Sequence, residues 1–280
     1  MKVARKILTV TLAVFMAIGF ILCALSFSLL IADGVCEQSA RILPSYDRED
    51  ILETLNKEIW SEEDYDFLYR QTGLTREPLD ALKDTPEKIL AFQDALYYRG
   101  TIKHQDAAPT TPHDYIPNYA APIAPLKDGD VLVTSACHTY GWRNGHAAII
   151  VDAKRGILLE SIAPGMLSDI STLNWFQHSS NFIILRMKGL TDEQRTEIAV
   201  SASQNLFHLP YTLTVGIFSD KDQGLTPSGT HCSHLVWQAY KNFGMDIDSN
   251  GGKIVTAHDI LQCDLFEIVQ VYGFDPIELW

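Results

Sequence analysis

A run of 26 residues without a charged side chain, from Ile7 to Ala32, most constrains how this chain folds. About 20 apolar residues cross the roughly 30 Å hydrocarbon core of a bilayer as a helix, whereas the apolar part of a cleavable signal peptide has only about 7–15 residues. The run therefore favours an uncleaved membrane anchor over residues 1–32. A long signal peptide, cleaved from a secreted protein, is the alternative.

The charges on either side of the apolar run predict its orientation. Lys2, Arg5 and Lys6 precede it, and Asp33 and Glu37 follow it. Because basic residues are enriched on the cytoplasmic side of a membrane span, we expect a single-pass protein of the cell membrane with its amino end inside. The anchor and the signal-peptide interpretations both place the remaining domain outside.

The composition of the rest of the chain is that of a globular protein without a basic face. The 280 residues are 46% hydrophobic and 20% charged. Beyond the first six residues there are 19 basic against 35 acidic side chains, a net charge of −16. Affinity for nucleic acid depends on clustered basic residues, so we expect no nucleic-acid partner.

Composition divides the chain after the anchor into three parts. Residues 33–100 have apolar side chains at helical spacing and form a predicted juxtamembrane helical region, whose acidic cluster after Ser61 indicates a solvated helix start. Residues 101–125 contain five prolines and predict an extended linker. Residues 126–280 form the predicted catalytic domain.

The third part predicts a sheet with helices packed against it. A turn ending at Gly156 joins the second and third predicted strands into an antiparallel hairpin. A capping box at Thr191 and Gln194 opens one helix, and another helix begins at Cys232 and ends before Gly244. We therefore expect an α+β domain with an antiparallel sheet of about five strands, at residues 130–134, 146–151, 157–160, 182–185 and 266–271.

Cys232 is the candidate nucleophile because it occupies the first turn of a predicted helix. Unpaired backbone N–H groups and the helix dipole stabilise a thiolate at that position, and the thiolate is the reactive form of cysteine. The alternative is a core residue, since Cys232 shares one helical face with Leu235, Val236 and Ala239.

His146 is the candidate base, and Glu160 the candidate residue that orients it. His146 begins an apolar strand, where its imidazole can take the thiol proton and return it to a leaving group, although a structural histidine is the alternative. Glu160 is a charged residue in the apolar run of the paired strand, opposite or diagonal to His146 across the predicted turn. Asp152 competes for the same role, but it is better explained as the start of the turn.

Three further side chains are candidates for contact with a substrate. His231 and His234 flank Cys232 and are candidate donors to an oxyanion, together with the backbone N–H of Cys232. Tyr211 follows Pro210 and is expected to border the same cleft. These assignments place the substrate at the beginning of the predicted helix.

The cysteine and histidine pattern leaves two other possibilities. Two disulfides outside the membrane are the alternative to a free thiol, formed among Cys36, Cys137, Cys232 and Cys263. A zinc site formed by Cys137, His138, His146, His231 and Cys232 is the other possibility, but it matches neither a CxxC nor an HExxH spacing. We therefore expect no metal and no cofactor.

The two motifs resemble those of the NlpC-type papain-like cysteine peptidase superfamily. The segment Cys232-Ser-His-Leu-Val-Trp-Gln-Ala-Tyr240 and the strand that starts Gly145-His-Ala-Ala-Ile-Ile-Val carry the resemblance. Because the histidine precedes the cysteine, the order is similar to that of the circularly permuted YiiX/YebB-like branch. Gly129-Asp130, Pro210-Tyr211 and the segment from Ala257 to Leu261 extend the resemblance, which covers about residues 126–273.

The resemblance implies a permuted papain-like fold and a function. It makes Cys232 the nucleophile, His146 the base and Glu160 the orienting residue, with Tyr211 in the cleft. The implied activity is that of a thiol hydrolase, a peptidase or amidase that acts on cell-wall peptides through an acyl-enzyme. The alternatives are an acyltransferase or esterase of the same fold, acting on a lipid-linked amide or ester, and a non-catalytic wall-binding module.

Overall fold

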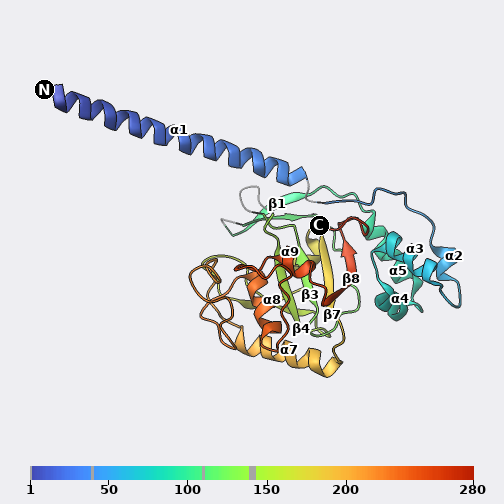
Figure 1. Ribbon diagram of the computed structural model, residues 1–280. Coiled ribbons are helices and arrows are strands. Elements are labelled where there is room, and N and C mark those ends of the chain that lie inside the picture. The colour runs from blue at the N-terminus through green and yellow to red at the C-terminus, as the bar shows by residue number, and fades with distance from the viewer. Residues whose placement is uncertain (1, 39–40, 109–110, 139–142) are drawn as a thin grey trace.

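A six-stranded antiparallel sheet forms the centre of the computed structural model, which describes residues 2–38, 41–108, 111–138 and 143–280. The strand order is β6-β5-β4-β3-β7-β8 (Figure 1). The bounds are β3 (Val131–Thr134), β4 (His146–Asp152), β5 (Ile157–Glu160), β6 (Asp169–Thr172), β7 (Phe182–Met187) and β8 (Phe266–Tyr272). The predicted α+β class is confirmed, and so are the five predicted strands. The additional strand is β6, a largely exposed edge with the polar sequence Asp-Ile-Ser-Thr, which has no strand-like hydrophobic pattern.

The strands at the centre of the sheet are buried on both faces. All four side chains of β3 are buried. Val131 and Val133 belong to one hydrophobic cluster, the first core, and Leu132 belongs to a separate cluster on the other face, the second core. In β4, Ile149 and Ile150 divide between the clusters in the same way. A sheet that is apolar on both sides must be covered on both sides.

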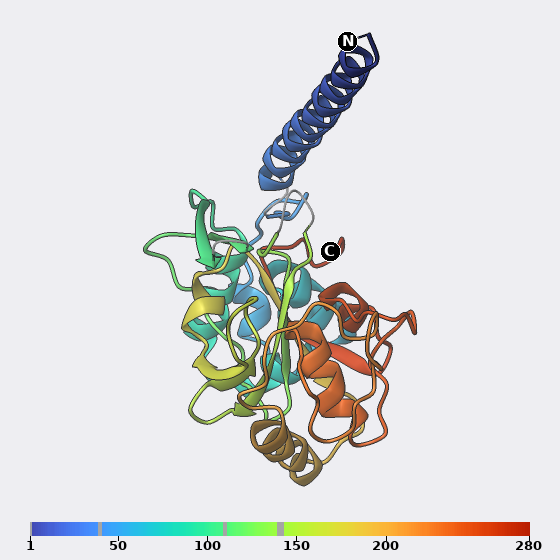
Figure 2. The ribbon, with the colours of Figure 1, turned by 90° about the vertical axis from the view of Figure 1, so that its left-hand side faces the viewer.

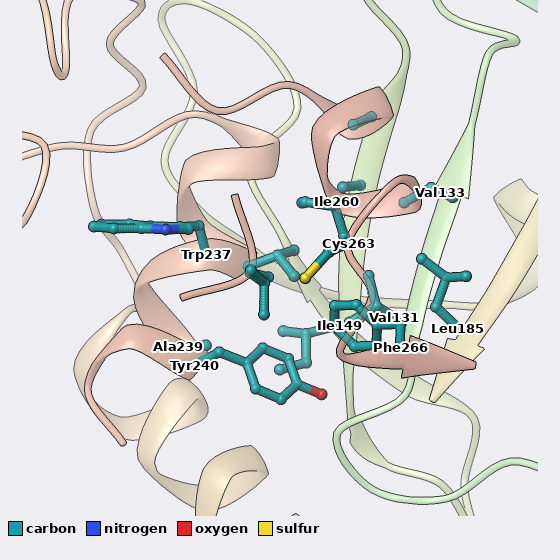
Figure 3. Close-up of a cluster of buried hydrophobic side chains, with 14 of the residues drawn as sticks. Val131, Val133, Ile149, Leu185, Trp237, Ala239, Tyr240, Ile260, Cys263 and Phe266 are labelled. Carbon is teal, nitrogen blue, oxygen red and sulfur yellow. The ribbon is translucent and has the colours of Figure 1, made fainter. Parts of the chain in front are cut away.

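Helices from the carboxyl-terminal part cover the first face. They are α7 (Asp192–Asn205), α8 (Cys232–Lys241) and α9 (Ala257–Leu261). Figure 3 shows part of this cluster, in which Tyr240 of α8 and Ile260 of α9 lie with Val131 and Phe266 of the sheet. The predicted capping box is present, because the Thr191 side chain accepts from the Gln194 N–H while the Gln194 side chain accepts from the Thr191 N–H.

Helices from residues 33–100 cover the second face, on the opposite side of the sheet in Figure 1. Leu68, Leu79 and Phe92 from these helices are buried in one cluster with Leu132 and Ile184 of the sheet. The predicted helical region is therefore one layer of the same folded body. Its helices are α2 (Leu52–Leu55), α3 (Glu62–Thr72), α4 (Arg76–Leu82) and α5 (Pro86–Leu96), and α6 (Asn174–His178) packs on the same side.

A buried ion-pair network joins this helical layer to the sheet. Arg186 of β7, which is 2% exposed, donates from Nε to Oδ1 of Asp130 at 2.8 Å and from Nη2 to Oδ2 at 2.6 Å. Its Nη1 donates to Glu77 of α4 at 2.6 Å. Two parallel charge-assisted hydrogen bonds fix the guanidinium geometry, and a charge buried to this extent requires such partners.

Residues 101–125 are part of the folded body, so the prediction of an extended linker was wrong. They contain a two-stranded antiparallel hairpin of β1 (Lys103–Ala108) and β2 (Thr111–Tyr115). After the hairpin, Ile116, Ala121 and Ala124 are at most 2% exposed. The prolines prevent regular secondary structure after the hairpin. Ala121 and Ala124, which lie between prolines, nevertheless pack in the second core. The Ile116 N–H donates to the His178 carbonyl at 2.8 Å.

The helix α1 (Lys2–Gln38) projects from this body as a single rod (Figures 1 and 2). Within it, residues 10–28 are apolar and have none of their residues buried against the rest of the chain. At 1.5 Å per residue, this length is enough to cross a bilayer core. One helix near the amino end is therefore long and apolar enough to span a membrane or to serve as a signal sequence.

A pair of glycine substitutions tests the junction between α3 and β8. Gly73 (φ +72°) follows α3, and an added Cβ would overlap the Val271 carbonyl, whereas Gly244 (φ +80°) follows α8 and has open space around it. We expect Gly244→Ala to cost about 1–2 kcal/mol of unfolding free energy, from the left-handed backbone alone. Gly73→Ala should cost about 3 kcal/mol or more, because the two backbones must also move apart.

Urea unfolding of the full chain in detergent, followed by tryptophan fluorescence, measures both values, since no tryptophan lies in α1. Equal losses for the two variants would show that the contact between Gly73 and β8 does not stabilise the fold.

Candidate active site

Cys232 is the first residue of α8, as predicted, and it is 8% exposed. The preceding residue, His231, is the N-cap, and its ring nitrogen Nδ1 accepts a hydrogen bond from the His234 N–H. The helix packs on β4 and β5, with Leu235 and Val236 buried in the first core. The sulfur atom is therefore held at a helix amino end, where the dipole favours an anion.

His146 is the first residue of β4, where a glycine allows the chain to enter the sheet. Gly145 has φ +67°, and a Cβ added to it would lie 2.6 Å from the Thr134 carbonyl oxygen and would overlap the Trp280 ring. Thr134 is the partner of His146 across the β3–β4 ladder. The imidazole is 4% exposed, and it packs edge-on against Trp175 at 5.2 Å between ring centroids.

Glu160 lies within hydrogen-bonding distance of His146, as the sequence predicted. The register pairs Ile149 with Leu159, so His146 and Glu160 are diagonal neighbours on one face of the β4–β5 ladder. Nε2 of His146 is 2.6 Å from Oε2 of Glu160. The competing residue Asp152 accepts from the Arg155 N–H at 3.1 Å, within the β4–β5 turn, and so has the turn role that the sequence favoured.

The hydrogen bonds at this site favour an ion pair over two neutral groups. Burial disfavours charge on His146, but hydrogen bonds with Cys232 and Glu160 outweigh it and raise the pKa of His146 to about 10. Burial also disfavours a thiolate, but the hydrogen bond with His146 and the nearby charges of His146 and His231 lower the pKa of Cys232 well below its usual value. Since Glu160 occupies Nε2, Nδ1 is the ring nitrogen left for the thiol.

A cavity of about 210 Å³ opens at Cys232. Tyr211 lines it, as predicted, and burial followed by the charge of Cys232 raises the pKa of the tyrosine hydroxyl. The other side chains that line it come from four separate segments of the chain: Asn144, Leu213, His231, Ser233, Ile254, Val255 and Thr256. The sulfur therefore faces a space that can hold a small group of a substrate.

The two histidines that flank Cys232 have different positions. His231 lines the cavity, and its Nε2 is buried with no hydrogen-bond partner among the described residues. His234 does not line the cavity, because its ring nitrogens are 2.9 Å from Thr230 Oγ1 and 2.8 Å from the Lys221 carbonyl oxygen. Burial lowers the pKa of His234 to about 4. The structure therefore places His234 behind His231 and outside the lining of this cavity, with both ring nitrogens close to other polar groups of the chain.

Several residues around the site carried no signal in the sequence. The Ser171 hydroxyl donates to the second carboxylate oxygen of Glu160, and Trp175 and Phe176 enclose the His146 ring. Ser171 lies on β6 and the two aromatic residues on α6, neither of which was predicted. Asn144 precedes the Gly145-His146 motif, but only the folded loop shows that it reaches the cavity.

Three cysteines outside α1, namely Cys137, Cys232 and Cys263, are free thiols. Cys23 in α1 is also free, and the side chain of Cys36 lies outside the described part of the chain. Burial raises the pKa of Cys263. The site thiol and this thiol in the first core therefore differ in the direction of their pKa shifts.

Comparison with solved structures finds a similarity of fold, whereas the comparisons of sequence find none. No protein-family profile matches the chain, and no curated protein matches it. Among solved structures, the chain is similar to the crystal structure of the metalloprotein YiiX from Escherichia coli O157:H7. The TM-score is 0.42 and the sequence identity 15%, over 52% of this chain and 98% of that chain.

The opposite pKa shifts predict how each thiol reacts with iodoacetamide. The alkylation rate of Cys232 should rise through a low pKa and then stay level up to about pH 10, where His146 loses its proton. In His146→Ala the pKa of Cys232 should move up, so its rate at pH 6.5 should fall at least about tenfold. Cys263 serves as the internal control and should react slowly in both proteins.

Peptide mass spectrometry of the full chain in detergent reads each cysteine separately. If Cys232 reacts no faster than Cys263 at pH 6.5, or if His146→Ala has no effect, the ion pair is absent.

Proposed function

We propose that this protein is a thiol hydrolase that forms an acyl-enzyme on Cys232. The observation that supports it best is the buried arrangement of a cysteine at a helix amino end, a histidine, and a carboxylate 2.6 Å from that histidine. We further propose that residues from about 126 onward have the permuted papain-like fold of the NlpC-type superfamily. The order of the His146 and Cys232 motifs supports this assignment.

In the acylation step, the Cys232 thiolate attacks the substrate carbonyl carbon, and the carbonyl electron pair moves to the oxygen. The backbone N–H of Cys232 and Nε2 of His231 are the donors proposed for this oxyanion. When the tetrahedral intermediate collapses, the C–N bond breaks and Nδ1 of His146 gives its proton to the leaving amine. The product is a thioester on Cys232.

In the deacylation step, His146 acts as the base. It takes a proton from water, whose oxygen attacks the thioester carbonyl, and the Cys232 thiolate leaves again. Throughout the cycle Glu160 holds the ring by Nε2 and stabilises its positive charge, while the Ser171 hydroxyl holds Glu160. This division of roles makes Glu160 a positioning residue.

The substrate that we propose is a peptide amide of the cell wall. The apolar α1 supports a membrane-anchored protein with the domain outside, because basic residues precede the apolar run. A secreted form after signal cleavage would meet the same substrate. The net charge of −16 beyond the first six residues gives no reason to expect a nucleic acid or another strongly anionic partner.

Replacing the sulfur tests the mechanism directly. Cys232→Ala should abolish turnover of a cell-wall tetrapeptide and the thioester adduct seen by intact-protein mass spectrometry. The free energy of unfolding should stay within about 1 kcal/mol of that of the parent. Cys263→Ala removes a thiol from the core and should keep turnover. Residual turnover by Cys232→Ala at the parent rate would contradict the mechanism.

The side chain of His231 can be tested without losing the helix cap. His231→Asn keeps a good N-cap residue but removes the buried Nε2, so we expect kcat to fall about 10²–10³-fold with little loss of stability. Steady-state kinetics in the parent and the variant measure this. An unchanged kcat would leave the backbone N–H of Cys232 as the proposed oxyanion donor and would exclude Nε2.

A lipid-linked ester or amide is the second candidate substrate, because apolar side chains stand at the cavity mouth. Leu213 is 61% exposed and Ile254 is 39% exposed, and both line the cavity. Parallel assays with a tetrapeptide and with an acyl ester in micelles distinguish the two substrates, and the product shows whether water or an alcohol accepts the acyl group. Thioester formation with neither would favour the non-catalytic wall-binding module.

A further inference from the structure

A second cluster of titratable side chains lies at the β1–β2 hairpin, and it shares no residue with the candidate active site. His104 comes from β1, Asp114 from β2, and His138 from the segment after β3. Their donor atoms all lie within 4.8 Å of one another. Two imidazoles and one carboxylate, brought together from three places in the chain, are a ligand set that binds zinc and other divalent transition metals.

The two imidazole nitrogens converge on one carboxylate oxygen, Oδ1 of Asp114. Nδ1 of His104 is 2.5 Å, and Nε2 of His138 is 3.3 Å, from Oδ1 of Asp114. Bonds of 2.0–2.1 Å in tetrahedral geometry separate neighbouring ligand atoms by about 3.4 Å. The His138–Asp114 distance already meets this value, and His104, on a two-stranded hairpin, has to move by about 1 Å.

The surroundings of Asp114 match those of a metal-binding carboxylate. The Asp114 side chain is 0% exposed, and Nη2 of Arg143 is 2.9 Å from its other oxygen, Oδ2. Arg143 is itself held, because its Nη1 donates to the Ser135 carbonyl at 2.7 Å. A guanidinium on Oδ2 orients the carboxylate so that Oδ1 faces the two histidines, as outer partners of metal ligands do.

Solvent reaches the cluster from the side of His104. The His104 side chain is 35% exposed, whereas those of His138 and Asp114 are at most 1% exposed. An ion can therefore enter past His104 and keep a water molecule as its fourth ligand. A metal site needs such an entry path in addition to its ligands.

We propose that His104, Asp114 and His138 bind one divalent transition-metal ion of the zinc type. Nδ1 of His104, Nε2 of His138 and Oδ1 of Asp114 each donate a lone pair to the ion. When the ion binds, a proton on Nδ1 of His104 or on Nε2 of His138 moves to the second nitrogen of the same ring or to solvent. The ion connects the β1–β2 hairpin to the segment after β3. The proposal departs from the sequence-based expectation of no metal, and its ligand set shares only His138 with the zinc site considered there.

Calorimetric titration of the full chain tests this proposal, in detergent and after removal of metal with a chelator. The parent should bind one equivalent of Zn²⁺, and His104→Ala should weaken binding more than about tenfold. His208→Asn is the matched control, because His208 is an exposed histidine whose positive φ suits asparagine, and it should bind as the parent does.

Two further variants keep the test decisive. His104→Cys replaces one zinc ligand by another, so it should restore stoichiometric binding if His104→Ala loses it by loss of a ligand. Cys232→Ala removes the site thiolate, which can itself hold zinc, and it should leave the titration unchanged. No uptake by the parent, parent-like affinity in His104→Ala, or loss of binding in Cys232→Ala would each overturn the proposal.

The alkylation rate of Cys232 in His104→Ala separates this proposal from the proposed hydrolase. A variant that loses zinc but keeps a fast Cys232 supports two independent sites. A fast Cys232 in a parent that binds no zinc overturns the metal site alone.

Discussion

The burial of the central sheet on both faces is the constraint on which the rest of the structure depends. Each strand at the centre divides consecutive apolar side chains between two cores, as Leu132 and Val133 do in β3. Neither face can be left in water, so α7 to α9 cover one and α2 to α5 cover the other. The helices that precede the sheet in the chain are therefore as necessary to cover it as α7 to α9, which lie between β7 and β8.

The same constraint explains the buried charges in the fold. Arg186 lies in β7 and is 2% exposed, so its guanidinium must be paired within the protein. Asp130, the residue before β3, accepts two hydrogen bonds from this guanidinium. Glu77 of α4 accepts a third. This network fixes how the helical layer meets the sheet, because the planar guanidinium donates its hydrogen bonds only in set directions.

Buried hydrogen bonds favour an ion pair in the candidate active site. His146 and Glu160 lie on adjacent strands, and the α8 amino end brings Cys232 to the same end of the sheet. Low exposure removes water that would weaken the hydrogen bonds, so a thiolate and an imidazolium stabilise each other in a site where either charge alone would be costly. The second core reaches this site through aromatic packing, since Phe176 belongs to that core and its ring centroid lies 5.9 Å from that of His146.

Local patterns in the sequence determined the features that depend on neighbouring residues. Runs of apolar residues predicted five strands, Thr191 and Gln194 predicted the start of α7, and the turn at Gly156 placed Glu160 beside His146. Only the tertiary structure decided the rest. It placed His234 away from the cavity, Ser171 on Glu160, and the supposed linker against the second core. These depend on contacts between segments far apart in the chain, and no local periodicity or spacing records which segment will cover which face.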